Sequence, residues 1–565
     1  MLLNGGPLNS APLNGYGNSV IPQPVPVTRG VAFRWRLRVM IGGEDLSPQL
    51  TGAVTVDRER GDSGVARLVL QLPVGPVVPS EWRGREVSII YVSTQAGETS
   101  EAVRFTGRIV RPEWDPLLRL LSCQCGDQLQ QRVEGMEVDQ IDTLVGGVWS
   151  ADVYEPVEGR SRWDYAQERL STVRGSLDAA PDGALRMTSW YAGAPDFVFG
   201  TGTTVYESVR FSDADLTTLT NVVEIEGDIR FPRLWQKNVR YTWAHPVDDF
   251  CTWRLDSTEL PDIAMVQGAV ESSGQTLLQG AIWDRLPPTS PDPCGTGQAW
   301  INSYPDLLLG GAWNAGRRWT QSVTEQYRLR VVAEASVEAA GEVIGRDRVA
   351  LEVENAAAEA WESEPFDSGE TGFQDLRDDS RRDPALRVAL ERATTAVVAA
   401  HNATEVSWDV PTSMVMGVDL VHTLRLEDQG VLVQSRCSRV YDTFDLAGGI
   451  ALTTLSVAVM RGGGTVSDPL VPPAPPVYPQ PDPDEPSGVV TNLPTQLGGR
   501  LESPEYDDEL PGFAGNYASV IPGLEAFPRR MDLDAPEIAA ERRDELPVEI
   551  VATYRVAIPN DLLEL

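Results

Sequence analysis

Few side chains in this 565-residue chain have the type and spacing that chemistry at a shared site would need. The three histidines, His245, His401 and His422, are too few and too scattered to form a histidine-based metal site. The only lysine, Lys237, is followed by Asn238, whereas a phosphate-binding loop needs lysine followed by serine or threonine. No H-E-x-x-H or G-x-S-x-G motif occurs. We therefore expect no catalytic residues, no cofactor and no bound metal.

The five cysteines are the other group that could do chemistry. Cys123 and Cys125 are two residues apart, which on a strand places both on one face, while Cys251, Cys294 and Cys437 are remote. There is no C-x-x-C pair. We favour buried or half-buried free thiols in a protein made in a reducing cytoplasm, and a metal or cluster assembled from distant cysteines is the alternative.

Carboxylates are abundant: 82 acidic against 47 basic residues give a net charge of −35. Such a surface repels phosphate backbones and anionic lipid heads, which disfavours specific nucleic-acid binding and membrane-surface binding. A glycosidase needs two carboxylates at a set separation, but no sequence feature marks one pair. Asp115, between Trp114 and Pro116, comes nearest to an acid in apolar surroundings, and a turn at a strand end explains it better.

Alternating side chains predict a first β-domain over residues 31–127. Phe33, Trp35, Leu37 and Val39 alternate with arginines, and similar runs follow between glycine-containing turns. Six or so short antiparallel strands at this spacing predict a small barrel or sandwich. The intervening arginines are Arg34, Arg36 and Arg38. We expect them to form a solvated or intersubunit face that pairs with carboxylates.

Residues 128–215 predict a small α+β domain. In it Ser161 caps a helix, Gly175 ends the helix, and a short strand pair follows at 185–190. Residues 216–464 predict a second β-barrel or α+β region, with a loop insertion at 284–320 that is rich in proline, glycine and tryptophan. Within it, Asp383 is expected to cap a helix that has Pro384 in its first position.

The two ends of the chain have a different composition. Residues 1–30 repeat Leu-Asn-x-x-Pro and predict an extended N-terminal arm that lies on a partner or on other subunits. Residues 465–487 predict a proline-rich linker, and residues 488–565 an acidic C-terminal arm. No apolar run approaches the length of a membrane span, and the first residues lack the features of a secretory signal.

An internal repeat links the two β regions. Gly84 precedes one strand and Arg108 follows 24 residues later in the returning strand, whereas Gly417 and Arg439 repeat this layout with a spacing of 22 residues. The fold we expect is therefore mainly β, with two small β-barrel-like domains flanking a small α+β domain, plus extended N- and C-terminal arms.

Parts of the chain resemble the hub proteins that close the tail tube of long-tailed bacteriophages. Within Val54–Gln130, the resemblance to the first domain of that family includes Trp82–Val87, Phe105–Arg108 and Cys123–Asp127. Met416–Arg461 resembles the closing barrel of the family. The opening Leu-Asn-x-x-Pro repeat resembles N-termini of phage tail and baseplate proteins.

The resemblance implies a structural virion protein, without enzymatic activity, at the tail tip or baseplate. Such a hub is a homotrimer that adapts a sixfold tail tube to a threefold tip, contacts the tail tube, the distal tail proteins and a central spike or fibre, and lets DNA pass on ejection. One alternative is a tip enzyme that degrades cell wall or polysaccharide. The other is a receptor- or glycan-binding tip protein that stacks sugars on three tryptophans, although we prefer core packing for these residues: Trp300, Trp313 and Trp319.

Overall fold

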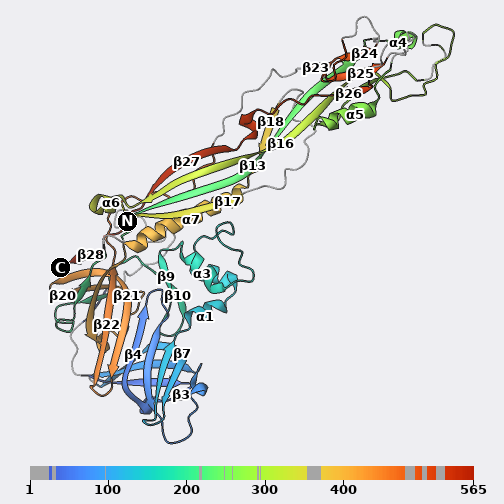
Figure 1. The fold of residues 1–565 in the computed structure, drawn as a ribbon. Helices are drawn as coiled ribbons and strands as arrows, with labels where there is room; N and C mark the ends of the chain where they lie inside the picture. The colour runs from blue at the N-terminus through green and yellow to red at the C-terminus, as the bar shows by residue number, and fades with distance from the viewer. Residues whose placement is uncertain are drawn as a thin grey trace, which may run out of the picture.

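The computed structural model describes residues 24–27, 33–95, 97–215, 219–246, 249–256, 259–288, 292, 294–352, 371–476, 490–498, 505–516 and 528–565. These residues form a head and a long arm that projects from it (Figure 1). The head contains a 15-stranded sheet and the arm is built on an 8-stranded sheet. The expectation of a mainly-β protein is confirmed.

The head sheet combines the strands of both predicted β regions. Along its main path the order is β1-β11-β20-β21-β4-β5-β8-β7-β6-β2-β3, with β22 and β28 also on β21, β19 on β22, and β12 on β19. The strands are β1 (Val25–Val27), β2 (Phe33–Ile41), β3 (Glu44–Asp45), β4 (Leu50–Glu59), β5 (Val65–Gln71), β6 (Glu86–Gln95), β7 (Glu98–Asp115), β8 (Leu120–Gly126), β11 (Phe197–Phe199), β12 (Arg210–Ser212), β19 (Thr404–Pro411), β20 (Thr423–Asp428), β21 (Val431–Asp445), β22 (Ile450–Val459) and β28 (Leu562–Glu564).

Two cores lie side by side along this sheet. The first is built on β2 and β4–β8 and contains Val54, Leu68 and Phe105, all at most 1% exposed. The second is built on β19–β22 and contains Trp408 and Val440, both fully buried. The predicted barrels are not seen, because the sheet is open among the described residues and β21 pairs antiparallel with β4, joining the two sets of strands.

The internal repeat corresponds to the β6–β7 and β20–β21 hairpins. Gly84 precedes β6, as expected. The second copy differs at its start, because β20 begins only at Thr423; Val418 and Leu420 lie before it and are buried in the core.

The small α+β unit contains α1 (Leu129–Glu134), α2 (Val138–Val145), α3 (Arg162–Leu170) and the hairpin β9 (Gly175–Ala179) and β10 (Leu185–Ser189). The Ser161 hydroxyl accepts a hydrogen bond from the Asp164 amide at 3.2 Å, which confirms the predicted cap. The predicted helix end is wrong: α3 ends at Leu170, and Gly175 begins β9.

The arm is a hairpin of two very long strands, β13 (Val222–Ala244) and β16 (Leu308–Val332), and all of β13 pairs with residues 310–332 of β16. Near the head it is widened by β17 (Ile344–Glu352) and β27 (Leu546–Arg555), and α7 (Asp379–Ala400) packs on it (Figure 1). Farther out lie β14 (Thr276–Leu277), β15 (Ile282–Arg285), β18 (Thr371–Asp375) and β23 (Val490–Leu493). The remaining elements are α4 (Phe250–Asp256), α5 (Ile263–Ser272), α6 (Glu334–Ala340), α8 (Ala540–Arg543), and a small sheet of β24 (Thr495–Gly498), β25 (Gly512–Asn516) and β26 (Arg530–Asp532).

The predicted loop insertion at 284–320 overlaps β16, which begins at Leu308. The glycines in this segment suggested a loop, but those of β16 lie within the strand. At two of them, side chains on the adjacent strands leave no room for a Cβ atom. A Cβ at Gly311 would lie 3.0 Å from the Trp283 ring, and one at Gly316 would lie 2.9 Å from the Asn238 side chain. In this arm, glycine therefore makes space for tryptophan and asparagine across the sheet.

Two other predictions need correction. Helix α7 begins at Asp379, capped by the Asp378 carboxylate, so Pro384 lies inside the helix and Asp383 is not the cap. The described parts of the expected C-terminal arm do not reach away from the molecule: β23 pairs with β13, β27 with β16, and β28 with β21 in the head.

Of the predicted N-terminal arm, only residues 24–27 are described, and their strand β1 pairs with β11. The rest of residues 1–30 lies outside the described residues. The predicted linker is described up to residue 476. This part of it lies beside β27, because the Tyr554 hydroxyl donates to the Val471 carbonyl at 2.8 Å.

Candidate functional site

The cysteines divide into two groups. Cys123, Cys125 and Cys437 are free and buried, as expected, and the first two share the buried face of β8. Burial raises the pKa of Cys123 and of Cys437 to about 12, which keeps both thiols protonated and unreactive. The prediction of free thiols is wrong for Cys251 and Cys294, which form a disulfide at the far end of the arm.

The three histidines lie in separate places. His401 is buried between the Val397 carbonyl and the Ser336 hydroxyl, at 2.7 and 2.8 Å, and burial lowers its pKa. The His422 ring accepts a hydrogen bond from the Asp419 amide at 2.9 Å. Among the described residues, no group of three histidine, cysteine or acidic side chains is placed to hold a metal ion.

The three tryptophans proposed for sugar stacking do not form one platform. Trp313 is buried and stacks on Trp283 with ring centres 5.6 Å apart. Trp319 stacks on Trp235 at 6.1 Å, and Trp300 packs edge-on against Phe250 at 4.8 Å. Each ring packs against other aromatic side chains of the arm.

Asp115 forms the turn that the sequence suggested. Its carboxylate accepts hydrogen bonds from the amides of Leu117 and Leu118, at 2.8 and 3.0 Å. The carboxyl therefore fixes the β7–β8 connection, which is a structural role.

Buried ion pairs mark the seam between the two cores of the head. Arg104 on β7 binds Asp442 on β21 through two hydrogen bonds of 2.7 and 2.8 Å, and both side chains are at most 1% exposed. The Thr453 hydroxyl also donates to Asp442 at 2.6 Å. Because a buried charge is tolerated only when it is paired, this contact fixes the position of one set of strands on the other.

A second chain of charges connects the seam to the α+β unit. Asp419 binds Arg58 of β4 at 2.5 Å and Arg186 of β10 at 2.7 Å, and Arg186 also binds Asp178 of β9 at 2.9 Å. Burial alone would raise the pKa of Asp419, but the two guanidinium groups lower it to about 2. Asp419 therefore stays charged and joins three parts of the head.

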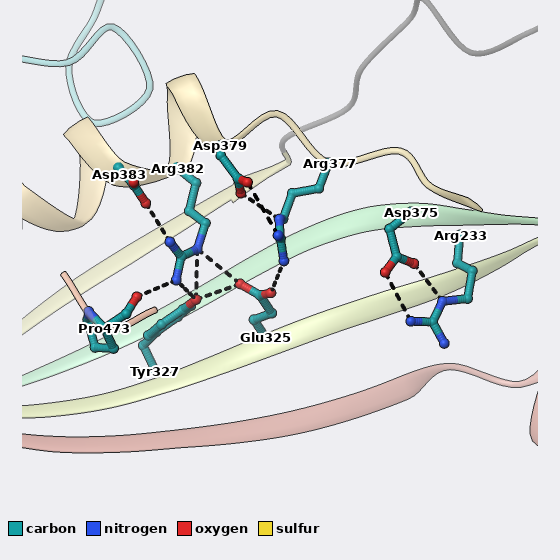
Figure 2. Close-up of polar contacts among 9 residues, drawn as sticks. All are labelled: Arg233, Glu325, Tyr327, Asp375, Arg377, Asp379, Arg382, Asp383 and Pro473. Carbon is teal, nitrogen blue, oxygen red and sulfur yellow. Dashed lines mark hydrogen bonds and ion pairs between the residues drawn. The ribbon is translucent and has the colours of Figure 1, made fainter. Parts of the chain in front are cut away.

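A third cluster lies in the arm, between β16 and the start of α7 (Figure 2). Glu325 of β16 is fully buried and accepts hydrogen bonds from Arg377 at 2.9 Å, Arg382 at 3.3 Å and the Tyr327 hydroxyl at 2.6 Å. Arg382 also donates to the Pro473 carbonyl at 2.7 Å. The cluster thus ties the long strand, the start of α7 and the linker to one another.

One hollow brings two carboxylates together without burying them deeply. A cavity of about 200 Å³ is lined by residues that include Glu59, Glu405, Arg60 and Arg439. Burial raises the pKa of Glu59, while Arg439, 3.8 Å away, opposes that shift. It is one place in the head where an acid pair could be tested for catalysis.

Sequence reasoning did not identify the ion-pair clusters or the disulfide. The arginine-rich strands of the sequence indicated that carboxylate partners must exist. The predicted arginine face has one such partner, because Arg38 binds Glu101 at 2.7 Å. None of the described helices has the length and apolar composition of a membrane crossing.

No protein-family model matches the chain, and no curated protein matches it. Among solved structures, it is similar to a tail protein from Neisseria meningitidis MC58, with a TM-score of 0.35 and 9% identity over 75% of this chain and 96% of that one. A 43 kDa prophage tail protein from Shewanella oneidensis has a TM-score of 0.34 and 10% identity, over 75% of this chain and 98% of that one. A prophage tail protein from Listeria monocytogenes EGD-e has a TM-score of 0.30 and 7% identity, over 74% of this chain and 94% of that one. TM-scores this low give the likeness no weight for residue roles.

Proposed function

We propose that this chain is a structural, non-enzymatic hub protein of a bacteriophage tail tip. In this role three copies form a ring that joins a sixfold tail tube to a threefold tip and lets DNA pass. Its partners are other copies of itself, the tail tube and distal tail proteins, and a central spike or fibre. It then resides in the virion.

The observation that carries the proposal is the pair of cores in the head. Each set of strands has its own buried core and contains one copy of the repeated hairpin, β6–β7 or β20–β21. Two similar units per chain give six in a trimer, and a sixfold partner could bind all of them with related contacts. The buried Arg104–Asp442 pair supports this role because it holds the two units in one arrangement.

The net charge of −35 also supports passage of DNA. A channel lined by carboxylates repels the phosphate backbone and lets the duplex slide, whereas a basic channel would retain it.

Mass photometry and negative-stain imaging test the assembly. We expect a particle with the mass of three 61.7 kDa chains and a ring of six similar densities, alone or with tail-tube and distal-tail proteins added. A protein that stays monomeric with those partners present would contradict the hub.

Enzymatic activity needs a separate test on peptidoglycan and host surface polysaccharide. We expect no release of reducing ends or peptides above a heat-treated control. Release that is lost in the Glu59→Gln or Glu405→Gln variant would assign the 200 Å³ hollow as a catalytic site and overturn the non-enzymatic role.

A further inference from the structure

Four large apolar side chains are exposed at one end of the head. Val74 and Val78 follow β5, and Leu117 and Leu118 form the β7–β8 turn. Their exposed fractions are 95% for Val74, 88% for Leu117, 57% for Leu118 and 47% for Val78. We call these four residues the apolar patch. Scattered apolar residues are normal on a surface, but a group of this exposure indicates a binding site.

The two segments of the patch are held together by Arg119. Its guanidinium donates hydrogen bonds to the carbonyls of Leu72 at 3.2 Å, Gly75 at 3.1 Å and Pro73, and its own carbonyl accepts from the Leu72 amide at 3.0 Å. Arg119 has a positive φ of 56°, which is unfavourable for a side chain of this kind. The contacts that maintain this conformation also give the patch a fixed shape before anything binds.

The start of the chain matches the patch in chemistry. No acidic or basic residue occurs between Met1 and Thr28, although 23% of the whole chain is charged. Between Leu2 and Gln23 this stretch has seven large apolar residues: Leu2, Leu3, Leu8, Leu13, Tyr16, Val20 and Ile21. The loop that carries Val74 is likewise without charge from Leu72 to Ser80.

The strand order also directs the start of the chain toward the patch. β1 is parallel to β11 and β20, and two antiparallel steps through β21 make it parallel to β4. The chain therefore enters β1 from the end of the sheet where β4 begins and β5 finishes. That end carries the patch.

The distance is within reach. β1 and β5 are separated by five strand spacings of about 4.8 Å. The offset along the strand direction follows from the register of β21. This strand runs from Arg436, opposite Thr423, to Asp445, opposite Ala53, and β5 ends beyond that point. The offset is roughly 45 Å. An extended chain of 23 residues spans up to about 75 Å.

We propose that residues 1–23 bind the apolar patch of their own chain. The patch then receives leucine and other apolar side chains from this segment, and the two uncharged surfaces leave water together. The inference does not depend on the tail-tip function, because it concerns a contact within one chain.

Limited proteolysis with chymotrypsin tests the contact, since the segment contains Leu3, Leu8, Leu13 and Tyr16. In the full chain, we expect cleavage before residue 24 to become about tenfold faster in the Val74→Asp/Leu117→Asp variant. The control is Ile282→Asp, which replaces a side chain that is 65% exposed on the arm and should leave the rate unchanged. Both substituted patch residues are exposed, so circular dichroism and thermal unfolding should be unaffected.

Crosslinking identifies the occupant. We expect the Leu8→Cys/Leu118→Cys variant to form a crosslink within one chain, independent of protein concentration, because the three native free cysteines are buried. Equal cleavage rates in the parent and patch variants would overturn the proposal. Crosslinks formed only between chains, or loss of a tail-protein contact in patch variants without any change in cleavage, would assign the patch to another occupant and would also overturn it.

Discussion

The seam of the head and the outer face of the arm sheet use charge in opposite ways. In the head, arginine–aspartate pairs are buried at the seam between two cores, as in Arg104–Asp442. On the outer face of the arm sheet, ion pairs are exposed and shared. Asp228 contacts Arg328 at 3.8 Å and Arg348 at 3.5 Å, and Arg348 is 71% exposed.

This difference indicates that the two regions meet different demands. A buried pair is costly unless its geometry is complete, so it selects one relative placement of the strands around it. A network of exposed pairs contributes little to stability but keeps a long, two-faced sheet soluble. The head is therefore expected to be specific and intolerant of change, and the outer face of the arm tolerant.

The largest effect should come from breaking the seam. Replacing Asp442 by asparagine leaves the Arg104 charge buried without a counter-ion, and we expect a loss of about 3–5 kcal/mol in the free energy of unfolding of the head. Urea denaturation measures it. The matched control is Glu86→Gln, which breaks the exposed Arg108–Glu86 pair of 3.2 Å and should cost less than about 0.5 kcal/mol. Equal losses in both variants would contradict the comparison.

The disulfide of the arm allows a test of whether the arm and the head unfold independently. Cys251 and Cys294 are 43 residues apart, and closing a loop of that length stabilises the folded state by about 2–4 kcal/mol. The Cys251→Ser/Cys294→Ser variant should therefore lose hydrogen-exchange protection in β15 and α5. Protection in β21 of the head should stay unchanged, and a loss there would show that the two regions unfold as one.

The comparison also explains what could be predicted from the sequence. The strands of the first core were predictable because burial alternates along them: in β5, Leu68 and Leu70 are buried, whereas Arg67, Val69 and Gln71 are not. The open sheet was not predictable, because β21 meets β4 across nearly 400 residues of sequence, for example at Tyr441 and Asp57. Pairing of that kind depends on tertiary contacts rather than on local periodicity.

The candidate sites follow the same rule. The cap at Ser161 was predictable because it involves residues three apart. The Glu325 cluster was not, since its arginines, Arg377 just before α7 and Arg382 within it, lie 52 and 57 residues farther along the chain. The error at Pro384 has a local cause, because the Asp378 carboxylate caps the helix five residues before the predicted cap and so places the proline inside α7.

Acid should affect the head through Asp419. Its pKa of about 2 in the folded state lies below the value of 3.8 expected without its partners, so its stabilising effect is complete above about pH 4 and is lost as the pH falls toward 2. We expect the difference in unfolding free energy between the parent and Asp419→Asn to shrink by about 2 kcal/mol over that range. Acid titration of urea midpoints measures it.

The control for this titration is Asp468 beside β27. Its hydrogen bonds with Arg555 also lower its pKa to about 2, but its side chain is 25% exposed, compared with 12% for Asp419. Salt at high concentration should therefore remove the pH dependence linked to Asp468 and leave that of Asp419 in place. An Asp419 effect that disappears in salt would mean that the seam is open to water.

The smallest effect should come from the outer face of the arm. Replacing Arg348 by alanine leaves Asp228 with Arg328, just as Glu224 has two partners, Arg330 and Arg346, each at 3.6 Å. Since the remaining arginine and water can both solvate the carboxylate, we expect a change below about 0.5 kcal/mol in urea denaturation of the isolated chain. Arg348→Lys is the control for charge without the guanidinium shape. A loss above about 1.5 kcal/mol would contradict the tolerant face and would mean that this surface is covered and desolvated in the folded protein.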